Sequence, residues 1–300
     1  MIWAFAILAT LLASSAQAAS PVPPRAAITT PTAAPAMQDR SFITSDGVRL
    51  HYTEAGRGFR TLVFVPGWTM PAWIWNRQVE AFARNYHVIA FDPRGQGASD
   101  IARSGYDHVR RGEDIAELLA TIGPEPVVLV GWSLGVLDTL AYIQAQGDRH
   151  VAALVLVDNS IGENPPPVAF YAPPPRNHGK PLPRPEVMRR FVHTMFAQPQ
   201  PAPWLNRLTA AALRVPEWAA KALLAYPVPR TYWREAVYST TRPILYVVRQ
   251  HLAGQAENLA ANHRGAETAV WRDVGHALFV DDPPRFNALL RDFIVRRVWP

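Results

Sequence analysis

The sequence predicts an α/β protein with a doubly wound, mostly parallel sheet and a helical cap inserted near the middle of the chain. Short, continuous apolar runs alternate with stretches that suit amphipathic helices, and such runs are typical of parallel strands buried on both faces. The alternation stops over residues 160–241 and then resumes, which indicates an insertion that covers one edge of the sheet. Ligands of open α/β folds bind at the carboxyl ends of the strands.

The first 38 residues are expected to lie outside the folded domain. Residues 1–18 contain an apolar run, Ile2–Leu12, and end in the small residues Ala16-Gln17-Ala18. This is the pattern of a cleaved signal peptide, so we expect export to the periplasm or the medium, with no stable membrane insertion after cleavage. No Lys or Arg precedes the run, which keeps an uncleaved anchor as the alternative. Residues 19–38 are a Pro/Ala-rich linker, and the folded domain occupies residues 39–300.

The folded domain opens with a predicted hairpin. Ser41–Thr44 and Val48–Glu54 alternate apolar and polar residues on either side of the turn Ser45-Asp46-Gly47. The strands that follow are predicted at Thr61–Val65, Val88–Phe91, Val127–Val130, Ala153–Val157, Ile244–Val248 and in the apolar stretch Ala269–Val274. Helices are predicted at Trp73–Arg84, Val109–Ile122 and Leu134–Gln146, and an amphipathic helix lies near the C-terminus.

The inserted cap is proline-dense at its start and helix-like afterwards. Apolar patterns at Val187–Phe196 and Leu205–Leu224 predict helices over the edge of the sheet. The large apolar side chains of this region either pack a small core of the cap or line an apolar substrate pocket. The candidate pocket residues are Trp132, Phe191, Met195, Phe196, Trp204, Trp218 and Trp233.

Composition excludes several kinds of site. The chain has 300 residues and no cysteine, so it forms neither disulfides nor thiolate metal sites. Its net charge of +6 comes mostly from arginine, but the sequence has no dense basic run and no nucleic-acid-binding module, so no nucleic-acid partner is expected. No metal or other cofactor is expected, and the sequence leaves the oligomeric state open.

A serine between two glycines marks the candidate active site. The run Gly131-Trp132-Ser133-Leu134-Gly135 joins the buried strand Val127–Val130 to the helix that begins at Leu134. A sharp turn here exposes the serine hydroxyl, and the glycines remove the Cβ atoms that would collide with the strand and the helix. The free amides at the start of the helix, with its positive dipole end, face the same point. Ser133 is therefore the candidate nucleophile.

A serine nucleophile needs a base, and His276 is the candidate. It follows the apolar stretch Ala269–Val274 in a Gly-His-Ala turn, and it precedes the C-terminal amphipathic helix. That position is a loop at the carboxyl end of a strand, from which the imidazole can reach Ser133 and accept its proton. Of the nine histidines, only His276 has this placement.

From about residue 39 to 297 the chain resembles the α/β-hydrolase superfamily, in particular its capped esterase, haloperoxidase-like and lactonase-like members. The resemblance rests on four motifs in the family's order, which are Val65-Pro66-Gly67-Trp68, Phe91–Asp100 (FDPRGQGASD), Gly131–Gly135 and Gly275-His276. It implies that the backbone N–H groups of Trp68 and Leu134 form the oxyanion hole, which stabilises the transition state of acyl transfer.

The acid that would orient His276 has two candidates. Relatives mostly place an aspartate just after the strand that is here Ile244–Val248, but in this chain the segment holds only Glu257. Some relatives place the acid at the end of the strand before the cap, where this chain has Asp158. Either carboxylate can hold the imidazole in the required tautomer. We take Asp158 as the acid and Glu257 as the alternative, and a Ser–His dyad is the third arrangement.

These residues predict an exported serine hydrolase that cleaves a small-molecule ester, thioester or lactone through an acyl-enzyme on Ser133. Water then releases the acyl group, so the reaction needs no cofactor or metal. One alternative is cofactor-free perhydrolysis or acyl transfer on the same serine. The other is a non-catalytic member of the superfamily that binds a ligand through its cap, since a fold does not fix a function.

Overall fold

The computed structural model describes residues 35–166, 176–177 and 180–300. The predicted signal peptide and all but the last residues of the predicted linker therefore lie outside the described residues. Within the described ranges, no helix is long and apolar enough to cross a membrane.

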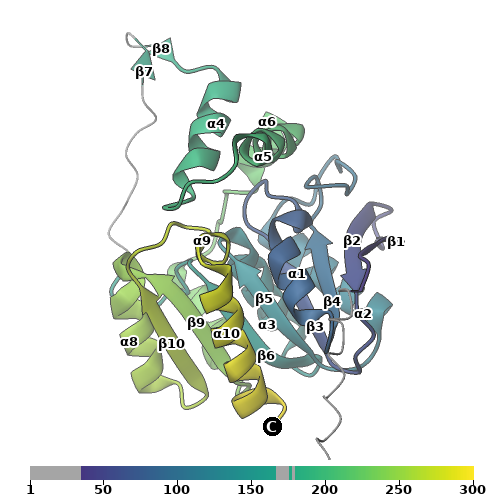
Figure 1. Ribbon diagram of the computed structural model, residues 1–300, viewed down its shortest axis with the longest axis vertical. Helices are drawn as coiled ribbons and strands as arrows, with labels where there is room; N and C mark the ends of the chain where they lie inside the picture. Colours follow the sequence, from purple (N-terminus) through teal and green to yellow (C-terminus); the bar gives the residue numbers. More distant parts are fainter. Residues whose placement is uncertain (1–34, 167–175, 178–179) are drawn as a thin grey trace, which may run out of the picture. The chain divides into compact units, whose positions relative to one another are not determined.

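An eight-stranded sheet forms the centre of the structure, in the order β1-β2-β4-β3-β5-β6-β9-β10 (Figure 1). The first two strands are an antiparallel hairpin, β2 also runs antiparallel to β4, and the other neighbours are parallel. The predicted mostly parallel α/β fold is thereby confirmed. The strands are β1 Gln38–Ile43, β2 Arg49–Ala55, β3 Thr61–Val65, β4 His87–Asp92, β5 Val127–Trp132, β6 Val151–Val157, β9 Ile244–Arg249 and β10 Ala266–Trp271.

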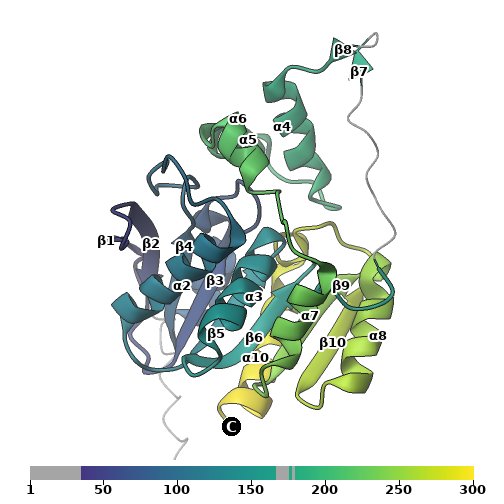
Figure 2. The same ribbon diagram turned by 180° about the vertical axis from the view of Figure 1, so that it is seen from behind.

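Helices cover both faces of the sheet, which explains why the central strands are apolar along their whole length. One apolar core joins the sheet to α2, α3, α7 and α8 (Figure 2), and the other joins it to α1 and α10 (Figure 1). The short helix α9 precedes α10. The bounds are α1 Asn76–Phe82, α2 His108–Ile122, α3 Leu134–Gln146, α7 Arg230–Tyr238, α8 Ala253–Asn262, α9 Leu278–Asp281 and α10 Pro283–Phe293.

Three cap helices lie beyond the carboxyl ends of the strands (Figure 1), and a two-residue strand pair precedes them in the chain. The helices are α4 Arg184–Thr194, α5 Ala202–Arg214 and α6 Glu217–Ala222, and the paired strands are β7 Arg176–Asn177 and β8 Lys180–Pro181. The cap contacts the body directly, because the Trp68 indole Nε1 donates a 2.8 Å hydrogen bond to the Ala220 carbonyl.

The structure corrects two features of the predicted cap. The helix expected over Leu205–Leu224 is divided into α5 and α6 at Val215-Pro216, because proline lacks an amide hydrogen and disfavours a helical residue before it. Residues 230–238 fall within the predicted cap range, but they form helix α7, which packs against α3 on the body (Figure 2). Its buried face, Trp233, Ala236 and Val237, completes the core on that side of the sheet.

Candidate active site

Ser133 lies at the sharp turn between β5 and α3. Its backbone has φ 55° and ψ −121°, a conformation that costs a non-glycine residue about 1–3 kcal/mol. A Cβ on Gly131 would lie 2.4 Å from the Gly135 carbonyl oxygen, and one on Gly135 would lie 2.5 Å from the Val65 carbonyl oxygen. Because both contacts are with backbone, only glycine fits at these two positions, and the turn depends on them.

Ser133, His276 and Asp158 form a chain of hydrogen bonds. Ser133 Oγ lies 2.8 Å from His276 Nε2, and His276 Nδ1 lies 2.7 Å from Asp158 Oδ2. Parallel pairing brings these groups together, since Trp132 at the end of β5 pairs with Val157 at the end of β6, and His276 follows β10 at the same edge. Such a chain lets the imidazole accept a serine proton while the carboxylate fixes its tautomer.

Asp158 is the carboxylate that reaches His276. It is 2 % exposed. It accepts two hydrogen bonds from Arg249 at the end of β9, one from the backbone amide at 2.9 Å and one from Nε at 2.6 Å. Burial by itself raises the pKa of Asp158, but the hydrogen bond from His276 and the charges of His276 and Arg249 outweigh it and hold the pKa below its usual value. This carboxylate is therefore ionised at neutral pH.

Glu257, the alternative acid, does not belong to the site. It lies exposed on α8, and within the described ranges it has no hydrogen bond or ion pair with His276. The expectation is therefore corrected: helix α8 begins beyond the end of β9 and directs this side chain into solvent.

The His276 loop is fixed by contacts to its main chain. Trp132 Nε1 donates a 2.8 Å hydrogen bond to the His276 carbonyl, and the Gly275 amide donates one of 2.6 Å to Asp281 Oδ2. The Trp132 ring is fully buried, with its centroid 5.2 Å from that of His276. Its indole is covered by protein and supports the His276 loop, and a role for Trp132 in a substrate pocket stays a prediction.

The two segments predicted to supply oxyanion donors border Ser133. Leu134 is the first residue of α3, so its amide has no partner within the helix. A Cβ on Gly67 would lie 2.9 Å from Ser133 Cβ, which places the segment before Trp68 beside the serine. Within the part of the chain that the structure describes, the Trp68 amide has no hydrogen-bond partner. Both amides are available to a ligand at the serine.

Gln96 holds the Trp68 segment in place. Its buried side chain accepts a 2.8 Å hydrogen bond from the Thr69 amide, and it donates to the carbonyls of Gly67 and Met70 at 3.1 and 2.9 Å. Thr69 has a positive φ of 60°, so these bonds stabilise a conformation that is otherwise unfavourable. No local sequence pattern predicts this role of Gln96, whose only signal is its place within the motif Phe91–Asp100.

Comparison with known proteins identifies the family of this chain. The sequence model described as the alpha/beta hydrolase family matches residues 62–289. The chain belongs to this family. The matched range contains Ser133, Asp158 and His276, together with both segments that border the serine.

The individual relatives are named for different reactions. A non-heme haloperoxidase from Rhodococcus erythropolis is 36 % identical over 118 residues, which are 39 % of this chain and 43 % of the relative. A soluble epoxide hydrolase from Corynebacterium sp. is 34 % identical over 116 residues, which are 39 % of this chain and 40 % of the relative. The chain thus matches about two fifths of the length of these curated relatives. An esterase structure from Rhodococcus sp. ECU1013 superposes with a TM-score of 0.70 and 25 % identity, over 86 % of this chain and 99 % of that one.

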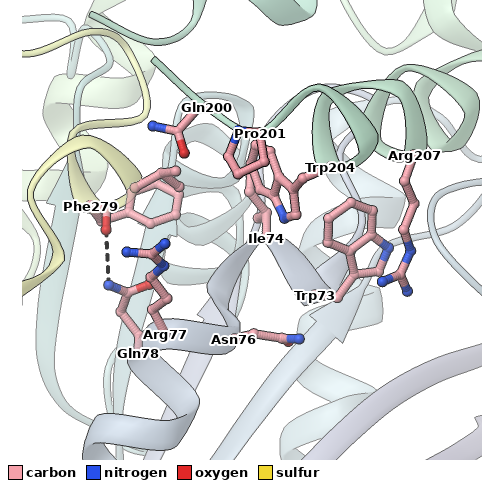
Figure 3. A pocket seen from close by; sticks show the side chains of 11 residues that line it. Trp73, Ile74, Asn76, Arg77, Gln78, Gln200, Pro201, Trp204, Arg207 and Phe279 are labelled. Atoms are coloured by element: carbon pink, nitrogen blue, oxygen red, sulfur yellow. Dashed lines mark hydrogen bonds between the residues drawn. The ribbon is translucent and has the colours of Figure 1, made fainter. Parts of the chain in front are cut away.

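Two of the predicted pocket residues, Phe191 and Trp204, lie between the cap and the body of the protein. Phe191 of α4 packs edge-on against Trp68, with ring centroids 5.0 Å apart. Trp204 of α5 lines a cavity of about 180 Å³ with Trp73 and Phe279 (Figure 3). Neither Ser133 nor His276 is among the described residues that line this cavity. Phe279 connects it to the active site, because its ring packs against Trp132.

The other predicted pocket residues serve as structural contacts. Met195 is 2 % exposed, and Trp233 packs on α7 among the rings of Tyr232 and His108. Protein covers both side chains, and their place in a substrate pocket stays a prediction. Phe196 packs edge-on against Trp204 with centroids 5.4 Å apart, and Trp218 lies half exposed against Tyr106.

Proposed function

We propose that this protein hydrolyses a carboxylic ester, thioester or lactone through an acyl-enzyme on Ser133. The observation that carries the proposal is the unbroken chain from Ser133 Oγ through the His276 imidazole to Asp158 Oδ2, with contacts of 2.8 and 2.7 Å. A hydroxyl is a weak nucleophile unless a base takes its proton, and this geometry supplies the base and orients it.

The reaction proceeds in two steps. Ser133 Oγ attacks the substrate carbonyl while His276 Nε2 accepts its proton, and the amides of Trp68 and Leu134 donate to the carbonyl oxygen as it becomes negative. The bond to the leaving oxygen or sulfur then breaks, and His276 returns the proton to that atom. Water attacks the acyl-enzyme by the same route, which releases the acid and restores Ser133. Asp158 remains ionised throughout and stabilises the imidazolium.

The cap supports a substrate with an apolar group. Phe191 and Trp68 form an aromatic contact at the segment that borders the serine. Elsewhere between the cap and the body, Trp204 packs against Phe196 and Trp73. Aromatic walls favour apolar acyl or alcohol groups over charged ones, because binding removes apolar surface from water.

The test is hydrolysis of p-nitrophenyl acetate and of an unsubstituted γ-lactone by the parent and by Ser133→Ala. For the parent we expect release of the acid from at least one substrate and, with the nitrophenyl ester, one equivalent of nitrophenol in an initial burst. Ser133→Ala should lose about 10⁶-fold in kcat, the loss typical of removing the nucleophile of a triad. Equal rates in both proteins would contradict the proposal.

A further inference from the structure

Arg249 shares one carboxylate oxygen with His276. It is the last residue of β9, the strand next to β6, so its main-chain amide and side chain both reach Asp158. Arg249 Nε lies 2.6 Å from Asp158 Oδ2, the same atom that lies 2.7 Å from His276 Nδ1. The Arg249 amide separately donates to Asp158 Oδ1 at 2.9 Å. The permanently charged guanidinium of Arg249 thus contacts the same carboxylate oxygen as the imidazole of His276.

Asp158 at the end of β6 faces this cation at the end of β9. The Arg249 side chain is one-third exposed while the Asp158 side chain is fully buried. The guanidinium therefore screens the carboxylate from the solvent side without closing the site.

We propose that Arg249 is a positioning residue that orients Asp158 and offsets part of its charge, so that the serine–histidine pair works at lower pH than it would without this cation. The inference rests on the proposed function. Asp158 at full negative charge would favour the protonated imidazole, and a protonated imidazole cannot accept the serine proton. The adjacent guanidinium reduces that preference, so activity on the acidic side is retained.

The other ionisable groups around this cluster do not supply the same effect. Burial lowers the pKa of His251, which follows β9, so this imidazole is neutral at neutral pH. Burial also holds the pKa of Tyr246 on β9 well above its usual value, and its hydroxyl donates to the Asn159 carbonyl. Asp281 on α9 accepts a hydrogen bond from the Gly275 amide. Among the described groups that face this cluster, Arg249 is the permanent cation.

The experiment compares the pH dependence of fluorophosphonate labelling and of ester hydrolysis in the full chain and three variants. Arg249→Gln removes the charge, Arg249→Lys keeps it without the guanidinium geometry, and Arg264→Gln removes an equal charge from an exposed residue before β10, at the opposite end of the strands. The amide hydrogen bond to Asp158 is present in every variant, so we expect all of them to fold.

The acidic limb of Arg249→Gln should move upward by about one pH unit, an effect typical of removing a charge next to an ionisable pair. Arg249→Lys should shift the limb by less than half as much, and Arg264→Gln should not shift it. An unchanged limb in a folded, labelled Arg249→Gln protein would overturn the role of Arg249 and leave the proposed function intact. A folded parent that neither labels nor hydrolyses would overturn the proposed function, and with it this inference.

Discussion

At the scale of single residues, the site depends on which carboxylate touches His276. Asp158 does so at 2.7 Å from the end of β6, whereas Glu257 is exposed on α8. An acid at the end of β6 therefore suffices for the triad geometry. The ends of β6 and β9 are neighbours in the sheet, so an acid on either strand can meet the same imidazole.

Asp158→Asn should lower kcat by about 10³–10⁴, because the amide favours the wrong imidazole tautomer and cannot stabilise the imidazolium. Glu257→Gln is the matched control, with the same chemical change on an exposed helix, and should change kcat by less than twofold. Steady-state kinetics on one ester measures both. A larger loss in Glu257→Gln than in Asp158→Asn would contradict the assignment of the acid.

The sequence alone indicates some of these residues and not others. Ser133 and His276 can be predicted because each has a local signature, a serine between glycines after a buried strand and a histidine after the last strand. The choice between Asp158 and Glu257 depends on a distance across strands, which no local pattern encodes. Arg249 and Gln96 act through hydrogen bonds to Asp158 and to the Trp68 segment, and their residue types are common in surface loops.

At the scale of elements, the turn between β5 and α3 contains a strained backbone conformation at Ser133, which glycine would adopt without strain. Ser133 has φ 55°, so Ser133→Gly should be more stable than Ser133→Ala by about 1 kcal/mol, even though glycine gains entropy in the unfolded chain. Ser239, which has an ordinary helical φ of −77°, is the matched position, and there the glycine variant should be the less stable one. Denaturant unfolding of the four variants tests this. A glycine variant that is less stable than the alanine variant at position 133, as expected at position 239, would argue against strain at Ser133.

Element boundaries were predictable where one local rule decides them. One strand, Thr61–Val65, and one helix, Leu134–Gln146, have the predicted bounds. A continuous apolar run defines the strand, and a turn serine followed by helix-forming residues defines the start of the helix. The break at Pro216 follows from the chemistry of proline, yet apolar periodicity on both sides hides it. The packing of α7 on α3 is set by tertiary contacts with Trp233, Ala236 and Val237, which the sequence pattern of an amphipathic helix does not specify.

At the scale of the whole molecule, the contacts that fix the fold and the site lie within residues 34–300. This range forms one unit that includes the sheet, the cap helices and the triad. The Trp68–Ala220 hydrogen bond and two bonds from Arg214 to the carbonyls of Gly95 and Ser99 tie the cap to the body.

A chain shortened to begin at Ala34 should therefore keep its kcat and a melting temperature within about 2 °C of the parent, a shift that corresponds to less than 1 kcal/mol for a domain of this size. A chain shortened to begin at Thr44 lacks β1 and its pairing with β2, and it should melt clearly earlier. Thermal unfolding followed by circular dichroism compares the three proteins. A large loss of stability in the Ala34 chain would show that the preceding residues contribute to the folded domain.

The most direct test of the central claim is the intact mass of the protein after exposure to a fluorophosphonate, with Ser133→Ala treated in parallel. This reagent reports an activated serine whatever the natural substrate is. The account predicts one adduct on the parent and none on Ser133→Ala. A well-folded parent that forms no adduct would contradict it and would favour a family member that binds a ligand without cleaving it. An adduct that persists in Ser133→Ala would also contradict it, because another residue would then be the reactive nucleophile.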